Sequence, residues 1–148
     1  MRTATFVYRR RVEFAETDMA GILHFANYFR FMEECEHAFF RSLGLRIHHE
    51  TKDGFRGFAR GECACRYEAP LRYEDEVELH LRCVEVRDKA LRYEIDFLLD
   101  KAIVARGSVT AVYVGNAGAG DGGSAEPRRI RAYPLPEAVK AAIEGNAT

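Results

Sequence analysis

Residues 24–44 read HFANYFRFMEECEHAFFRSLG and place apolar side chains at the three- and four-residue steps of a helix. The stripe consists of Phe25, Phe29, Met32, Cys35, Phe39 and Leu43. This spacing predicts a helix of about five turns that starts near His24. Gly44 stands where a left-handed residue would end it. Because the apolar face is broad and aromatic, we expect a curved sheet to wrap around the helix.

Alternation of apolar and polar residues predicts strands on both sides of this helix. The first strand runs from Phe6 to Phe14, and Arg10 is a charged exception on its apolar face. Four later strands are expected near residues 59–67, 77–83, 91–99 and 104–114. Their short connecting turns predict an antiparallel meander. The order of elements therefore predicts an α+β fold, with five strands around one long helix.

The remaining segments fit a single domain. The polar residues 45–57 are expected to form a connecting loop, and residues 115–126 a flexible Gly-rich loop. A short helix is expected to start near Pro136. The length of 148 residues fits one domain across residues 1–148, because domains usually hold about 100–200 residues.

Composition excludes several classes of partner. The chain has 22 Lys and Arg against 23 Asp and Glu, whereas a nucleic-acid binder needs a clear basic excess. No apolar run approaches the roughly 18 residues that a membrane span requires. The N-terminal residues lack the pattern of a secretory signal. We therefore expect a cytoplasmic protein with no nucleic-acid or membrane partner.

The cysteines give no sign of a metal site. Cys63 and Cys65 are two residues apart, and no Cys-x-x-Cys pair or nearby His cluster completes a ligand set. We expect all four thiols, Cys35 and Cys83 included, to be buried as small hydrophobic groups. No Gly-rich phosphate loop or serine nucleophile motif is present, so no cofactor and no metal are expected.

Asp18 is the first candidate for chemistry. It lies in the loop ETDMAG, residues 16–21, directly before the long helix. The simplest interpretation is a turn-forming aspartate, because its side chain bonds readily to nearby backbone. The helix start, however, offers unpaired N–H groups beside that carboxylate, as acyl hydrolysis requires. His24 is open between a general base, a carbonyl polariser and a structural residue.

The stretch from Val12 to Tyr28 strongly resembles the hotdog-fold acyl-CoA thioesterases of the 4-hydroxybenzoyl-CoA thioesterase and YbgC type. The matching positions are Asp18, Gly21, Ile22-Leu23, Asn27-Tyr28, Glu33 and Leu43-Gly44. Two later segments are also similar to that family, EAPLRYED at residues 68–75 and YPLPE at residues 133–137. The resemblance covers nearly the whole chain and agrees with the order of elements expected from periodicity.

The resemblance implies roles for individual residues. Asp18 would be the nucleophile or the general base, and the backbone N–H of Phe25 would hold the oxyanion. Tyr28 would line the acyl pocket. Many YbgC-type members carry a His where this chain has Phe25, and His24 stands one residue earlier. We therefore keep His24 as a further catalytic candidate.

The resemblance also implies a substrate and an assembly. Acyl-CoA is the expected substrate, and protomers would pair edge to edge as a homodimer or homotetramer with active sites at the dimer interface. Arg87 and Lys89, together with Arg92, are candidate ligands of the CoA phosphates. A second cluster follows the Gly-rich loop and consists of Arg128, Arg129 and Arg131. Solvated surface charge is the alternative for both clusters.

Other functions stay open on the sequence alone. A thioesterase acting on acyl carrier protein would use the same residues. A non-catalytic acyl-CoA or lipid-binding module on the same fold is a second alternative, although the presence of Asp18 argues against it. Aromatic and medium-chain acyl groups both suit the apolar residues near Tyr28.

Overall fold

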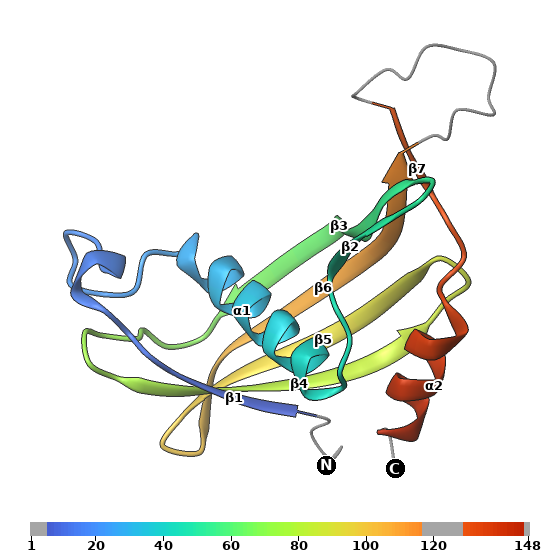
Figure 1. Ribbon diagram of the computed structural model, residues 1–148. Helices are drawn as coiled ribbons and strands as arrows, with labels where there is room; N and C mark the ends of the chain where they lie inside the picture. Colours follow the sequence, from blue (N-terminus) through green and yellow to red (C-terminus); the bar gives the residue numbers. More distant parts are fainter. Residues whose placement is uncertain (1–5, 117–128, 147–148) are drawn as a thin grey trace.

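A single antiparallel sheet curls around one helix in the computed structural model, which describes residues 6–116 and 129–146 (Figure 1). Over these residues the strands are β1 (Phe6–Arg11), β2 (His48–Thr51), β3 (Gly54–Tyr67), β4 (Glu76–Val86), β5 (Ala90–Leu99), β6 (Ala102–Asn116) and β7 (Ile130–Ala132). They pair in the order β1-β4-β5-β6-β3-β2, and β7 adds to β6. The helices are α1 (Asn27–Ser42) and α2 (Glu137–Gly145), and a 3-10 turn, η1, spans Phe14–Glu16.

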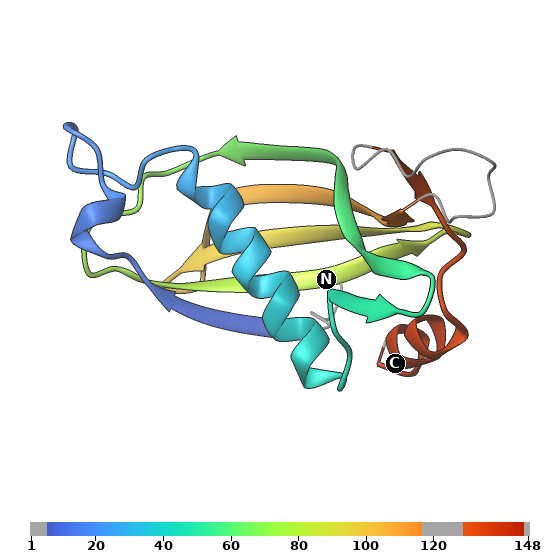
Figure 2. The same ribbon diagram turned by 45° about the horizontal axis from the view of Figure 1, so that its top comes forward.

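The core lies between α1 and the concave face of the sheet, which α1 crosses diagonally (Figure 2). The buried face of α1 consists of Tyr28, Phe31, Met32, Cys35, Glu36, Phe39 and Phe40. Inward residues of β4 and β5 meet it, among them Leu79, Leu81, Tyr93, Ile95 and Phe97. The expected stripe is therefore confirmed in its middle, whereas Phe25 lies outside the helix and is exposed. None of the described helices has the length and apolar character needed to cross a membrane.

The helix is shorter at its start than the periodicity indicates. It has 16 residues and begins at Asn27, three residues after His24. The residues before Asn27 form other bonds instead: the His24 N–H donates to Glu16 O at 2.9 Å, and the Ala26 N–H donates to His24 Nδ1 at 3.2 Å. At the other end Gly44 has φ +72°, as expected for a residue that closes a helix.

The expected meander of the four later strands is wrong in one part. Of those four strands, β4, β5 and β6 are neighbours in chain order, but β3 pairs with β6 instead of β4, and β1 pairs with the other edge of β4. Residues 45–57 are not a loop throughout: β2 and the start of β3 form a hairpin that turns at Gly54, with φ +111°. This hairpin and β7 raise the strand number above five in the described residues. The strand β2 escapes prediction because its residues are polar and mostly exposed.

Smaller corrections concern single residues. Phe14 is exposed, belongs to the turn η1 and does not continue β1. Gly115 and Asn116 lie in β6, paired with β7, so the expected Gly-rich loop starts later. Its other residues, 117–126, lie outside the described part of the chain. Of the four cysteines expected to be buried, Cys35 is buried, Cys65 and Cys83 are partly exposed, and Cys63 is exposed on β3. The expected helix near Pro136 is confirmed as α2.

The sheet approaches α1 closely at Gly107 of β6. A Cβ atom at this position would overlap the Met32 sulfur and would lie 3.2 Å from its terminal methyl carbon. The absence of a side chain at Gly107 therefore allows α1 to pack closely against the sheet.

Candidate active site

Asp18 lies on a tight loop whose ends are tied by backbone bonds. Its N–H donates to Ile22 O at 2.9 Å, and the Gly21 N–H donates to Asp18 O at 2.9 Å. Gly21 has φ +76°, which glycine adopts without strain. The carboxylate oxygen Oδ1 accepts the Ala20 N–H at 2.8 Å. The turn-forming role of Asp18 is therefore real, and Oδ2 still accepts no hydrogen bond from any described residue.

Arg10 anchors the start of this loop, which explains its place on the apolar face of β1. Its Nη1 and Nη2 donate to the two Glu16 carboxylate oxygens at 2.8 and 2.6 Å. Its Nε donates to Glu34 at 3.2 Å, and its guanidinium lies 4.2 Å from the centroid of the Phe31 ring. Burial acts to raise the pKa of Glu16, but the bonds from Arg10 and the Glu13 N–H together lower it. Glu16 is therefore held as a charged, buried carboxylate.

Glu16 also connects the loop to the start of α1. Its carbonyl oxygen accepts the His24 N–H at 2.9 Å and the Asn27 side-chain amide at 2.9 Å. The Leu23 N–H donates to Leu71 O at 2.7 Å, which ties the loop to the segment after β3. The residues on both sides of Asp18 are thus fixed independently of any ligand.

A cavity of about 540 Å³ opens beside this loop. Its lining includes Asp18, Ile22, Phe25, Tyr28, Tyr67 and Pro70. Tyr28 is buried, with its ring 4.8 Å from that of Tyr67, and burial raises the pKa of Tyr28 to about 12. Three of the sequence-derived candidates, Asp18, Phe25 and Tyr28, therefore meet at one cavity.

Phe25 lines this cavity and has a backbone carbonyl bonded to the sheet. Its side chain is 63% exposed and its ring stacks on that of His24 at 4.5 Å. Its carbonyl oxygen accepts the Tyr67 hydroxyl at 2.9 Å. Its own N–H donates to no described residue. An unpaired N–H and an unpaired carboxylate oxygen are therefore both available beside the cavity.

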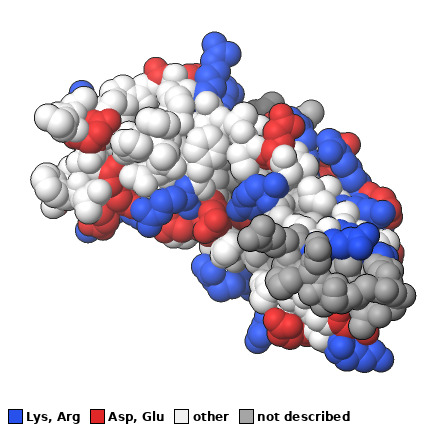
Figure 3. Space-filling view, turned by 90° about the horizontal axis from the view of Figure 1, so that it is seen from above, with Lys and Arg blue, Asp and Glu red and all other residues white. Residues whose placement is uncertain are grey.

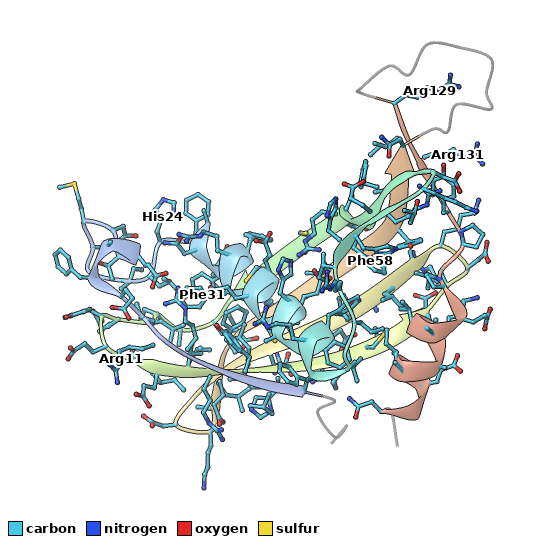
Figure 4. The ribbon with its side chains drawn as sticks, in the orientation of Figure 1. Arg11, His24, Phe31, Phe58, Arg129 and Arg131 are labelled. Atoms are coloured by element: carbon cyan, nitrogen blue, oxygen red, sulfur yellow. The ribbon has the colours of Figure 1, made fainter. Side chains whose placement is uncertain are left out.

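His24 does not line the cavity in this chain. Its imidazole stands above the loop, away from the sheet (Figure 4). Its Nδ1 accepts the Ala26 N–H, so the neutral ring with hydrogen on Nε2 fits this contact. In the structure the His24 side chain therefore binds the backbone N–H of Ala26.

The arginine and lysine candidates for phosphate binding lie far from Asp18 within one chain. Arg87 and Lys89 follow β4 at its C-terminal end, whereas the Asp18 loop lies beside the start of β4. A strand of 11 residues spans about 33 Å. Arg87 also pairs with Glu85 at 2.9 Å. Arg129 and Arg131 lie at the end of the molecule opposite His24 (Figure 4), and Arg128 lies outside the described residues.

Exposed apolar side chains gather at the end of the molecule that carries the cavity. The large exposed ones there are Phe14, Met19, Phe25, Tyr67 and Tyr73. Rings of Phe14 and Tyr73 meet edge to face at 5.7 Å. Figure 3 shows mostly uncharged surface at this end, at the left of the view. The cavity therefore opens within an apolar surface.

Two residues of the site escaped prediction. Glu16 was hidden in the loop, although the charged Arg10 on an apolar strand face was a signal that a buried acid lies opposite. Tyr67 gave no signal, because in the sequence it only continues the alternation of apolar and polar residues along β3.

Comparison with known proteins gives the family. The model of the thioesterase-like superfamily matches residues 12–143. The chain belongs to this superfamily. A protein of Aquifex aeolicus (strain VF5) named "Putative esterase" is 42% identical over 81 residues, which are 55% of this chain and 62% of that protein. The match thus spans less than two thirds of that relative's length.

Solved structures of thioesterases share this superfamily member's fold over almost its whole length. A gentisyl-coenzyme A thioesterase is 30% identical, covers 93% of this chain and 99% of its own, and superposes with a TM-score of 0.76. The 1,4-dihydroxy-2-naphthoyl-CoA thioesterase of Synechocystis is 18% identical, with coverage of 93% and 94% and a TM-score of 0.75, and supports the fold alone. The expected hotdog thioesterase fold is confirmed.

Proposed function

We propose that this protein hydrolyses acyl-CoA thioesters to the free acid and CoA. The observation that carries the proposal is that Asp18, with an unpaired carboxylate oxygen, and Phe25, with an unpaired N–H, line the same mainly apolar cavity. The superfamily and the similarity to a gentisyl-coenzyme A thioesterase support the same reaction.

In this reaction the Phe25 N–H binds the thioester carbonyl oxygen. Negative charge develops on that oxygen as the carbonyl carbon becomes tetrahedral, and one aimed donor contributes about 2.7–4 kcal/mol. Asp18 supplies the second function. It either attacks the carbonyl carbon through Oδ2 or takes a proton from the attacking water. The thiolate of CoA then leaves as the tetrahedral carbon collapses. After attack by water this step gives the free acid directly. After attack by Asp18 it gives an anhydride of the acyl group with Asp18, and water then hydrolyses the anhydride to release the acid and restore the carboxylate.

The acyl group would occupy the aromatic part of the cavity. Rings of Phe25, Tyr28 and Tyr67, with Pro70, offer flat apolar surfaces. Such a lining suits an aryl group, which gains from stacking as well as burial. The gentisyl group of the similar thioesterase is an acyl group of this kind.

CoA binding across two copies of the chain accounts for Arg87 and Lys89. Strand β2 pairs with β3 at Gly54–Gly57 and the Phe58 N–H donates to Ile47 O, so in the described part of the chain residues 59–67 of β3 present an open edge. An open strand edge readily pairs with a second chain. Antiparallel pairing of two such edges would place the Arg87 and Lys89 end of one copy near the Asp18 end of the other. The assembly proposed is a homodimer, or a homotetramer that contains this pairing.

Thiol release from a panel of aromatic, acetyl, medium-chain and long-chain acyl-CoAs tests the proposed reaction. Asp18→Asn should lower kcat about 100-fold or more, because a positioned acid or base contributes about 10²–10⁴. Asp53→Asn, on an exposed turn, is the matched control and should behave as wild type. Undiminished turnover in Asp18→Asn would remove Asp18 from the mechanism. Turnover only on acyl carrier protein, or binding without turnover, would favour the two alternative functions.

The phosphate-binding role of Arg87 and Lys89 has its own readout. Replacing both with glutamine should raise KM for acyl-CoA while leaving KM for a truncated pantetheine thioester unchanged. An equal effect on the two substrates would show that these side chains are ordinary solvated charges.

A further inference from the structure

We propose that Tyr67 is a positioning residue that, together with His24, clamps the Phe25–Ala26 peptide and so aims the Phe25 N–H into the cavity. This role rests on the proposed thioester hydrolysis. The clamp itself is a property of the fold.

Both polar groups of this peptide are held by side chains. The Tyr67 hydroxyl donates to the Phe25 carbonyl at 2.9 Å, and the Ala26 N–H donates to His24 Nδ1 at 3.2 Å. A planar peptide bonded at its oxygen and its nitrogen loses rotation about both flanking bonds. This holding matters because Phe25 precedes α1 and lacks the helical hydrogen bonds that would otherwise fix it.

The preceding peptide carries the N–H that would meet the substrate. Its carbonyl, from His24, accepts the Asn27 N–H at 2.9 Å. In a trans peptide the C=O and N–H point in opposite directions, so this bond turns the Phe25 N–H away from Asn27. The His24 N–H is in turn fixed to Glu16 O. The donor peptide therefore lies between two anchored neighbours, and Tyr67 provides the only anchor that comes from the sheet among the described contacts.

Tyr67 is well placed to act as a rigid donor. It is the last residue of β3, 42 positions from Phe25 in the sequence. Its ring packs edge to face on the buried Tyr28, with centroids 4.8 Å apart, which fixes the direction of the hydroxyl. Burial raises the pKa of Tyr67, so the hydroxyl keeps the proton that it donates.

Tyr67→Phe removes the hydroxyl and keeps the ring, so it tests the clamp directly. We expect kcat to fall about tenfold with KM within a factor of about two, because misplacing a catalytic group by 1 Å can cost about 100-fold. The thermal unfolding midpoint should stay within about 2 °C, because the half-exposed hydroxyl contributes little to stability. Tyr73→Phe is the matched control: Tyr73 is an exposed tyrosine at the same end of the molecule.

A spectroscopic readout separates the clamp from the reaction. The amide proton–nitrogen resonance of Ala26 reports the hydrogen bond at the Phe25 carbonyl, and it should move in Tyr67→Phe but not in Tyr73→Phe. An unmoved Ala26 resonance would overturn the clamp whether or not the protein has activity. A moved resonance with unchanged kcat, in an enzyme that Asp18→Asn inactivates, would overturn the catalytic role of the clamp. A wild-type protein without thioesterase activity would overturn the proposed function, and the resonance would then still decide whether the clamp exists.

Discussion

Replacing Glu16 with glutamine tests the anchor that holds the Asp18 loop. The side chains of Arg10 and Glu16 are 17% and 8% exposed, so the pair is largely shielded from water. Breaking a buried pair costs about 3–5 kcal/mol when the remaining charge has no other partner. Arg10 keeps Glu34 as a second acceptor, and glutamine keeps one oxygen. The expected loss of unfolding free energy is therefore about 2–3 kcal/mol at pH 7.

Urea unfolding followed by circular dichroism measures this loss, with Glu76→Gln as the control. Glu76 also pairs with an arginine, Arg11, but the side chains are 70% and 58% exposed. Replacing Glu76 should therefore cost less than about 1 kcal/mol. Each variant removes one carboxylate that pairs with an arginine. The two pairs differ in burial and in the further bond that Glu16 accepts from the Glu13 N–H.

The pH dependence gives the same prediction a second check. Because the pKa of Glu16 is lowered in the folded protein, its contribution to stability is present above the ordinary carboxyl pKa of about 4.3. That contribution disappears as the pH falls through the lowered value. The difference between wild type and Glu16→Gln should thus shrink on acidification. Equal stabilities at pH 7, or a difference that persists undiminished at pH 3, would refute the anchor.

Two further predictions concern the packing of α1. Burial raises the pKa of Glu36, although the nearby charge of Arg60 acts to lower it, so wild type loses stability relative to Glu36→Gln as the pH rises above about 4.3. In urea unfolding at pH 7, Glu36→Gln should therefore be more stable than wild type by about 1 kcal/mol. Equal stability of the two proteins at all pH values would contradict this. Gly107→Ala should lower the unfolding free energy by about 1–3 kcal/mol, because the added methyl group overpacks against Met32. Gly145→Ala is the control and should not lower it, because the space around Gly145 is open. Equal melting temperatures for the two variants would show that Met32 moves aside without cost.

The sequence predicts the parts of this fold that depend on repeated local patterns. The middle of α1 and the strands β4, β5 and β6 follow from periodicity, because each buries one face against the same core. The pairing of β3 with β6 could not be predicted in this way, because alternation indicates which face of the sheet a residue lies on but not which strand lies beside it. Polar β2 carries no apolar alternation to detect.

The candidate site divides in the same way. Asp18 and Tyr28 could be named because they match a local motif, and the structure brings both to the cavity. The Tyr67 contact joins residues 42 positions apart, so no local pattern could indicate it. In the sequence, Arg10 stands out only as a charged residue on an apolar strand face. Its role as the partner of Glu16 becomes clear only from the position of Glu16 in the structure.

The anchors of the Asp18 loop and the walls of the cavity are different sets of side chains. Arg10, Glu16 and Asn27 hold the loop from behind, whereas Ile22 and Pro70 face the cavity. The hydrogen bonds between Ile22 and Asp18 come from the Ile22 backbone, and every residue type except proline preserves them. Substitutions in the walls can therefore reshape the proposed acyl site while these bonds keep the Asp18 loop in place. Descendants of this chain have a route to new acyl specificities that leaves the position of the proposed catalytic group unchanged, and the same route is open to protein engineering.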